Sequence, residues 1–115
     1  MFRHIKREEI QQHLANHTPL TLVEALPEKY YRDGHLPGAI HLPHDQVRDR
    51  AVELLPDKDA FIVVYCANTP CQNSAIAARA LDALGYTNVA EYVEGKQGWV
   101  EAGLALERSA IEKAA

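Results

Sequence analysis

The sequence predicts an α/β protein in which helices cover both faces of a central, predominantly parallel sheet of four or five strands. Short apolar segments of strand length alternate along the chain with segments whose apolar residues recur at helical spacing. Residues 61–65 form an unbroken apolar run, mostly β-branched or aromatic, which is typical of an interior strand of a parallel sheet. This run is the clearest strand in the sequence.

The first half of the chain alternates helical and extended segments. Residues 7–15 are predicted to form a helix, because Ile10 and Leu14 lie one turn apart on an apolar side. Asp45 is a candidate N-cap for a further helix that includes Val47. The predicted elements after the first helix are a strand at 20–24, a helical turn at 28–32, a strand at 39–42 and a helix at 45–54.

The second half contains the clearest helix, at residues 73–84. Ile76, Ala80 and Leu84 recur at four-residue intervals along it, and Gly85 is a typical residue for ending a helix. The other predicted elements are a strand at 89–93, a short helix at 97–102 and a solvated or fraying C-terminal helix around 111–113.

The composition indicates one globular domain spanning residues 1–115, with 47% apolar residues and a net charge of −4. The chain has no run of basic residues, so nucleic acid is not an expected partner. Its N-terminus lacks the apolar stretch of a secretory signal, and no segment is apolar for long enough to span a membrane. We therefore expect a cytoplasmic protein with reduced cysteines, no membrane partner and no cofactor.

The candidate reactive residue is Cys66, which lies between the predicted strand 61–65 and the helix 73–84. Sites in parallel sheets form at the carboxyl ends of strands. A tight loop there directs backbone N–H groups and the positive end of the following helix inward, and these groups favour a thiolate, the nucleophilic form. From these residues alone, Cys66 is equally well explained as a small apolar residue that ends a buried strand. The residues expected to line the cradle are Ala67, Asn68, Thr69, Gln72, Asn73 and Ser74.

Four segments of the chain, in the correct order, resemble the motifs of one protein family. Residues 34–43 read GHLPGAIHLP, which is similar to the family signature G-H-I-P-G-A-x-x-I-P. Residues 63–66 resemble the family's strand and catalytic cysteine, residues 74–89 its next helix and turn, and residues 94–103 its closing G-G-x-x-x-W-x-x-A-G. The resemblance implies a rhodanese-like fold and sulfur transfer: Cys66 accepts a sulfane sulfur, stores it as a persulfide and passes it to a thiophilic acceptor.

The chain departs from the family pattern at the end of the strand 20–24. The family has an Arg and, four residues later, a Glu where this chain has Leu26 and Tyr30. Because both charges are absent together, no charge is left unpaired, and we interpret the change as an apolar replacement. Glu24 precedes these positions and is one of two charged residues expected near the site.

The loop after Cys66 departs from the pattern as well. Seven residues separate Cys66 from Ser74, where the family motif has five, and none of them is Arg or Lys. Lys96 occupies the position of the family's second glycine, and we expect its ammonium near the mouth of the loop. A neutral or singly charged sulfur donor would need less compensating charge here than a doubly charged one such as thiosulfate.

Phosphatases and arsenate reductases of related fold are a less favoured alternative. They require C-x5-R, in which a guanidinium grips the anion, and the corresponding position here is Gln72.

Three further assignments concern Cys71, His35 and metals. Cys71 gives the loop a C-x4-C spacing and is interpreted as a resolving thiol, a sulfur relay or a small loop residue. His35 is expected to brace the turn at Pro37-Gly38 rather than to act in catalysis. No metal site is expected, because the cysteine pair has no second pair of ligands at zinc-finger spacing.

Two functions from different classes follow. The leading hypothesis is a thiol sulfurtransferase that uses a small-molecule sulfur donor and a thiol or protein acceptor. The alternative is a non-catalytic or redox-sensing rhodanese-like module. An intact Cys66 favours the enzyme, whereas the uncharged loop favours the module. The oligomeric state is not predicted.

Overall fold

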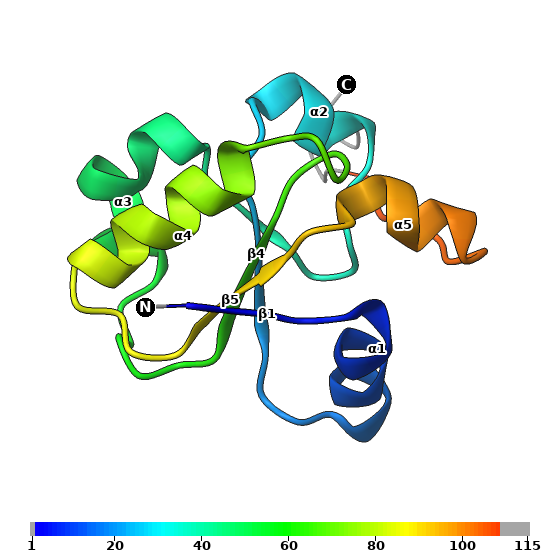
Figure 1. Ribbon diagram of the computed structural model, residues 1–115, viewed down its shortest axis with the longest axis horizontal. Coiled ribbons are helices and arrows are strands. Elements are labelled where there is room, and N and C mark those ends of the chain that lie inside the picture. The colour runs from blue at the N-terminus through cyan, green and yellow to red at the C-terminus, as the bar shows by residue number, and fades with distance from the viewer. Residues whose placement is uncertain (1, 109–115) are drawn as a thin grey trace.

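Five parallel strands form the centre of the computed structural model, which describes residues 2–108 (Figure 1). They stand in the order β1-β5-β4-β2-β3, and every neighbouring pair is parallel. The α/β fold with a mostly parallel sheet is therefore confirmed. The strands are β1 (Arg3–His4), β2 (Thr21–Glu24), β3 (Ile40–His41), β4 (Ile62–Tyr65) and β5 (Val89–Tyr92).

The apolar run predicted as an interior strand is the central strand β4. It pairs with β2 on one side and β5 on the other, and Ile62, Val63 and Val64 are fully buried. The strand β1 was not predicted, because a two-residue segment is too short to show a periodic pattern. It adds to the outer edge of β5.

Helices cover both faces of the sheet, as predicted. The helices α3 (Val47–Leu54) and α4 (Asn73–Ala83) pack on one face, and α1 (Arg7–Asn16) and α5 (Gly95–Glu101) pack on the other (Figure 1). The helix α2 (Glu28–Asp33) lies between β2 and β3 in the chain, and a short 3-10 helix (His44–Gln46) precedes α3.

The alternation of side chains along the strands assigns each buried residue to a face. Val64 packs in the core under α3 and α4, whereas Val63 and Tyr65 pack in the core beside α1 and α5. Two separate cores thus lie on opposite sides of one sheet.

The helix α4 ends where the sequence predicts. Gly85 has a positive φ of 95°, and the N–H of Tyr86 donates to the carbonyl of Leu81, which is the pattern of a Schellman motif.

Residues 111–113, predicted as a C-terminal helix, lie outside the described residues. Within residues 2–108, no helix is both long and apolar enough to cross a membrane.

Candidate active site

Cys66 directly follows β4 at the carboxyl edge of the sheet, as the sequence predicts, and its side chain is buried. Its carbonyl accepts a hydrogen bond from the Lys96 N–H at 3.0 Å, and the carbonyl of Ala67 accepts one from the Gln97 N–H at 2.9 Å. The start of the loop is therefore fastened to the first turn of α5.

Gly95 permits this close approach. Its φ is +63°, and a Cβ at this position would collide with the Cys66 carbonyl oxygen and lie 2.9 Å from the Ala67 carbonyl carbon. Only a glycine satisfies both the backbone angle and the lack of space. The first turn of α5 thus sets where the chain leaves β4.

The Cys66 thiol begins a chain of buried hydrogen bonds. Its sulfur donates to Ser74 Oγ at 3.3 Å, and this hydroxyl donates to Oε2 of Glu91 at 2.6 Å. Ser74 lies in the first turn of α4, and Glu91 lies on β5, which pairs with β4, the strand just before Cys66. The other carboxylate oxygen of Glu91 lies 3.4 Å from Nε2 of the exposed His4 on β1.

The expected stabilisation of the thiolate is not what the structure shows. Burial raises the pKa of the Cys66 thiol above its ordinary value, and the adjacent Cys71 thiol raises it further. The backbone N–H and the hydroxyl of Ser74 act in the opposite direction but do not overcome these effects. The loss of water around the sulfur thus outweighs the donors of the helix start, and Cys66 is a thiol at rest.

Cys71 lies within hydrogen-bonding reach of Cys66, and both are free cysteines. The half-buried Cys71 belongs to a turn in which its own N–H donates to the carbonyl of Asn68 at 3.1 Å. The loop therefore brings together the two thiols that the sequence singles out.

The remaining loop residues differ in their exposure. Thr69 and Gln72 are exposed, whereas Ala67, Asn68 and Asn73 are half-buried and Ser74 is buried. Of these, Ser74 has a direct contact with the sulfur.

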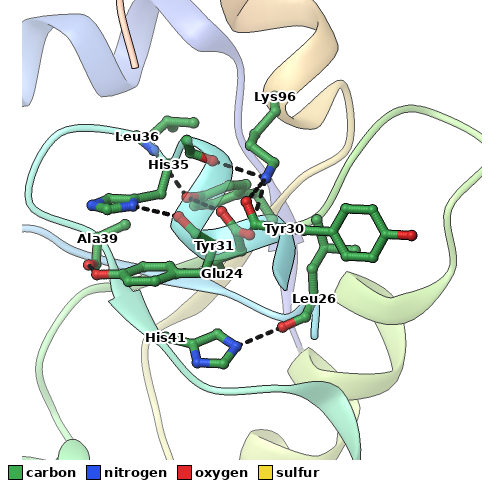
Figure 2. Close-up of polar contacts among 11 residues, drawn as sticks. Glu24, Leu26, Tyr30, Tyr31, His35, Leu36, Ala39, His41 and Lys96 are labelled. Carbon is green, nitrogen blue, oxygen red and sulfur yellow. Dashed lines mark hydrogen bonds and ion pairs between the residues drawn. The ribbon is translucent and has the colours of Figure 1, made fainter. Parts of the chain in front are cut away.

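Figure 2 shows a second buried polar cluster. It lies on the opposite face of the sheet, the face on which Tyr65 packs. The carboxylate of Glu24 is fully buried at the end of β2, where it accepts hydrogen bonds from the Tyr65 hydroxyl at 2.8 Å and from the Lys96 ammonium at 3.0 Å. The Tyr65 oxygen in turn accepts the N–H of Leu36 at 3.0 Å. Desolvation raises the pKa of Glu24, although Lys96 and Tyr65 oppose the shift.

This cluster revises the expected role of Lys96. Figure 2 shows its ammonium directed to Glu24, and it also donates to the carbonyls of Tyr30 and Gly34, each at 2.9 Å. An ammonium has three hydrogens to donate, and these three acceptors take all of them. Lys96 therefore compensates a buried carboxylate and has no donor left over for an anion at the loop mouth.

The apolar replacement at Leu26 and Tyr30 is only part of the change at the end of β2. Leu26 is buried, whereas Tyr30 is exposed and contributes its carbonyl to Lys96. Glu24, at the same end of β2, is paired with the ammonium of Lys96, which lies 72 positions later in the chain.

His35 is held within a stack of rings. Its Nδ1 lies 2.9 Å from the carbonyl of Tyr31, and its ring stacks on the Tyr31 ring at 3.9 Å (Figure 2). His41 stacks on the Tyr31 ring at 5.0 Å. The predicted brace of the Pro37-Gly38 turn is supplied instead by Glu107, whose carboxylate accepts the Gly38 N–H at 2.8 Å. His35 thus orders the end of α2.

Sequence reasoning missed Glu91, His4 and Tyr65 as parts of the site. A signal for Glu91 was present, because a carboxylate in a predicted buried strand requires a partner. No local pattern identifies that partner as Ser74, because the two residues meet only after α4 packs against β5. Among residues 2–108, no group of His, Cys, Asp or Glu side chains is arranged to hold a metal ion.

A family model described as "Rhodanese-like domain" matches residues 6–102. A solved structure of the rhodanese-like domain from the Anabaena sp. Alr3790 protein is 27% identical, with a TM-score of 0.82, and the match covers 100% of this chain and 85% of that one.

Two curated proteins are similar in sequence. The HTH-type transcriptional regulator Rv0324 of Mycobacterium tuberculosis is 36% identical over 91 residues, or 79% of this chain and 39% of that protein. The thiosulfate sulfurtransferase PspE of Escherichia coli is 36% identical over 64 residues, or 56% of this chain and 59% of that protein. The matches therefore cover 39% and 59% of these relatives, less than two thirds of the length of either.

Proposed function

Because the chain belongs to the rhodanese-like domain family, we propose that it is a thiol sulfurtransferase that carries sulfane sulfur as a persulfide on Cys66. The observation that carries this proposal is the placement of Cys66. The residue directly follows the central strand β4, its carbonyl is held by the first turn of α5, and its sulfur contacts the first turn of α4. The similarity to a protein named thiosulfate sulfurtransferase supports the same class of reaction.

The transfer is a pair of substitutions at sulfur. The Cys66 sulfur loses its proton and attacks the outer sulfur of a donor persulfide, forming one S–S bond while the donor's own S–S bond breaks. The donor leaves as a thiolate and takes up a proton. An acceptor thiolate then attacks the outer sulfur of the Cys66 persulfide, which restores the cysteine without net oxidation or reduction.

The charges around the loop favour a donor of low charge, such as glutathione persulfide or cysteine persulfide. Lys96 is neutralised by Glu24, and the buried carboxylate of Glu91 is bound to the same hydroxyl that the Cys66 sulfur contacts. A dianion such as thiosulfate would meet only backbone dipoles and a nearby negative charge, so it is the poorer substrate.

The test is intact-protein mass spectrometry after incubation with glutathione persulfide or thiosulfate, with peptide mapping of the modified site. Wild type and Cys71→Ser should each gain one sulfur atom on Cys66, and Cys66→Ser should gain none. Faster loading by glutathione persulfide than by thiosulfate supports the donor class. Sulfur on Cys71 in the Cys66→Ser protein would reverse the roles of the two cysteines, and no sulfur on either would reject the enzyme.

The contact between Cys66 and Cys71 favours a second candidate, a redox-sensing module. A peroxide would oxidise one thiol to a sulfenic acid, and the other would displace water to form a disulfide, so that two electrons and two protons leave the pair. Burial raises the pKa of Cys66 and so lowers its thiolate fraction, which would make the reaction with peroxide slow. A disulfide that forms in dilute peroxide, together with no sulfur loading from any donor, would establish this alternative.

A further inference from the structure

We propose that Ser74 and Glu91 form a proton relay that accepts the proton of Cys66 when its sulfur attacks a donor. Ser74, which touches the reacting sulfur, is then a catalytic residue, and Glu91 is a positioning residue that acts through it. The role in sulfur transfer rests on the proposed function, whereas the relay itself is a property of the thiol.

The hydrogen bonds of the relay all run in the same direction. The Cys66 S–H donates to Ser74 Oγ, and the Ser74 O–H donates to Glu91 Oε2 at 2.6 Å. Ser74 and Glu91 are 1% and 6% exposed, so these two hydrogen bonds are shielded from bulk water. A single shift of both protons converts thiol and carboxylate into thiolate and carboxylic acid.

The carboxylate of Glu91 decides which hydrogen bonds Ser74 can donate. The Ser74 hydroxyl has one proton to donate, and in the resting state it donates that proton to Glu91. The hydroxyl therefore cannot also donate to a Cys66 thiolate while Glu91 remains ionised. After the double shift, Ser74 donates to the thiolate and Glu91 donates to Ser74, so both contacts are kept. Loss of the proton to water would instead place two negative charges across one hydroxyl in a buried site.

The other ionisable groups around the relay are few. Cys71 faces Cys66 from the loop, and His4 faces Glu91 from β1, where its exposed imidazole links the carboxylate to solvent. The first turn of α4 contains no acidic residue, and Lys96 is bound on the other face of the sheet. Within the described chain, Glu91 is the carboxylate bound to the hydroxyl that Cys66 contacts.

The relay predicts a distinctive pH profile for Cys66 reactivity. A thiol that loses its proton only to water becomes about tenfold less reactive for each pH unit below its pKa. Internal transfer to Glu91 leaves the number of bound protons unchanged. The plot of rate against pH therefore gains a flat limb, a region at lower pH in which the rate does not depend on pH.

The test measures the rate at which methyl methanethiosulfonate modifies Cys66 in a Cys71→Ser background across pH. This small neutral reagent has no ionisable group of its own. The Cys66 sulfur attacks a sulfur atom of the reagent, as it would attack the outer sulfur of a donor. The parent protein should show the flat limb, whereas Glu91→Gln and Ser74→Ala should show a single limb and react at least about tenfold more slowly in that range. Ser74→Thr should restore the flat limb, and Glu94→Gln, which removes an exposed carboxylate on the same segment, should retain it.

Three results would overturn the relay. They are a single limb in the parent protein, a flat limb that survives Glu91→Gln, and no reaction of folded Cys66 at any pH. A parent profile with a single limb that only moves to lower pH in Glu91→Gln would identify Glu91 as a repulsive charge. Circular dichroism and urea unfolding confirm that each variant is folded. Because no sulfur donor is used, failure of sulfur loading with an intact flat limb would reject the proposed function and leave the relay standing.

Discussion

The ammonium of Lys96 lies 3.0 Å from the carboxylate of Glu24, a residue 72 positions earlier in the chain. The backbone N–H of the same lysine holds the carbonyl of Cys66 at 3.0 Å. One residue therefore fastens the reactive loop through its main chain and neutralises a buried charge on the other face of the sheet through its side chain.

Lys96→Met should strongly destabilise the fold. The substitution keeps the apolar length of the side chain but leaves Glu24, which is fully buried, without its counter-ion. Breaking a buried pair in this way costs about 3–5 kcal/mol of unfolding free energy. Urea denaturation near neutral pH measures the loss. Lys29→Met, at an exposed position on α2, is the matched control and should change stability by less than about 0.5 kcal/mol. Equal effects of the two substitutions on the free energy of unfolding would show that the ion pair between Lys96 and Glu24 does not stabilise the fold.

Glu24 should make stability depend on pH in an unusual direction for a carboxylate. Its pKa is raised in the folded protein, so folding favours the protonated form, and its contribution to stability is complete below the ordinary carboxyl pKa. That contribution is lost as the pH rises through the raised value. Wild type should therefore lose stability relative to Glu24→Gln as the pH rises above the ordinary carboxyl pKa, as measured by urea unfolding at each pH. A difference that stays constant as the pH rises from the ordinary carboxyl pKa would contradict the raised pKa.

Tyr65→Phe and Tyr92→Phe should have opposite consequences although both rings are fully buried on the same face of the sheet. The Tyr65 hydroxyl connects Oε1 of Glu24 with the N–H of Leu36, whereas Oε2 of Glu24 keeps its bond to Lys96. Removal of the hydroxyl therefore leaves the buried Leu36 N–H without a partner and Glu24 with one bond fewer, at a cost of about 1–3 kcal/mol. The Tyr92 hydroxyl finds no hydrogen-bond partner among residues 2–108. Tyr92→Phe should therefore leave the thermal unfolding midpoint unchanged or raise it, and a clear loss there would reveal a bound water.

Gly95→Ala should damage the site more than Gly103→Ala. Both glycines have positive φ, at 63° and 84°, so each substitution costs about 1–2 kcal/mol of backbone strain. A Cβ on Gly103 meets nothing within 4 Å, whereas one on Gly95 collides with the main chain of Cys66 and Ala67. Urea unfolding should show the larger loss for Gly95→Ala, and the rate of Cys66 modification should change in that variant alone. Similar losses of unfolding free energy in the two variants would mean that the loop moves aside from the added Cβ at no further cost in stability.

The sequence by itself determined the architecture and the place of the reactive cysteine. The apolar run at 61–65 indicates a strand covered on both faces, and the periodicity of 73–84 indicates the helix that follows. Because sites form at the carboxyl ends of parallel strands, these two local patterns already place Cys66 at the edge where chemistry occurs. Such patterns lie within one element and need no knowledge of its neighbours.

Only the tertiary structure decided the environment of that cysteine. The donors predicted to favour a thiolate are present at the start of α4, but burial outweighs them, and burial depends on how the whole loop is covered. Glu91 meets Ser74 across 17 positions, and Lys96 meets Glu24 across 72. These contacts follow from the strand order, which places β5 and β2 on either side of β4. Strand order arises from non-local pairing, which the local periodicity of a sequence does not specify.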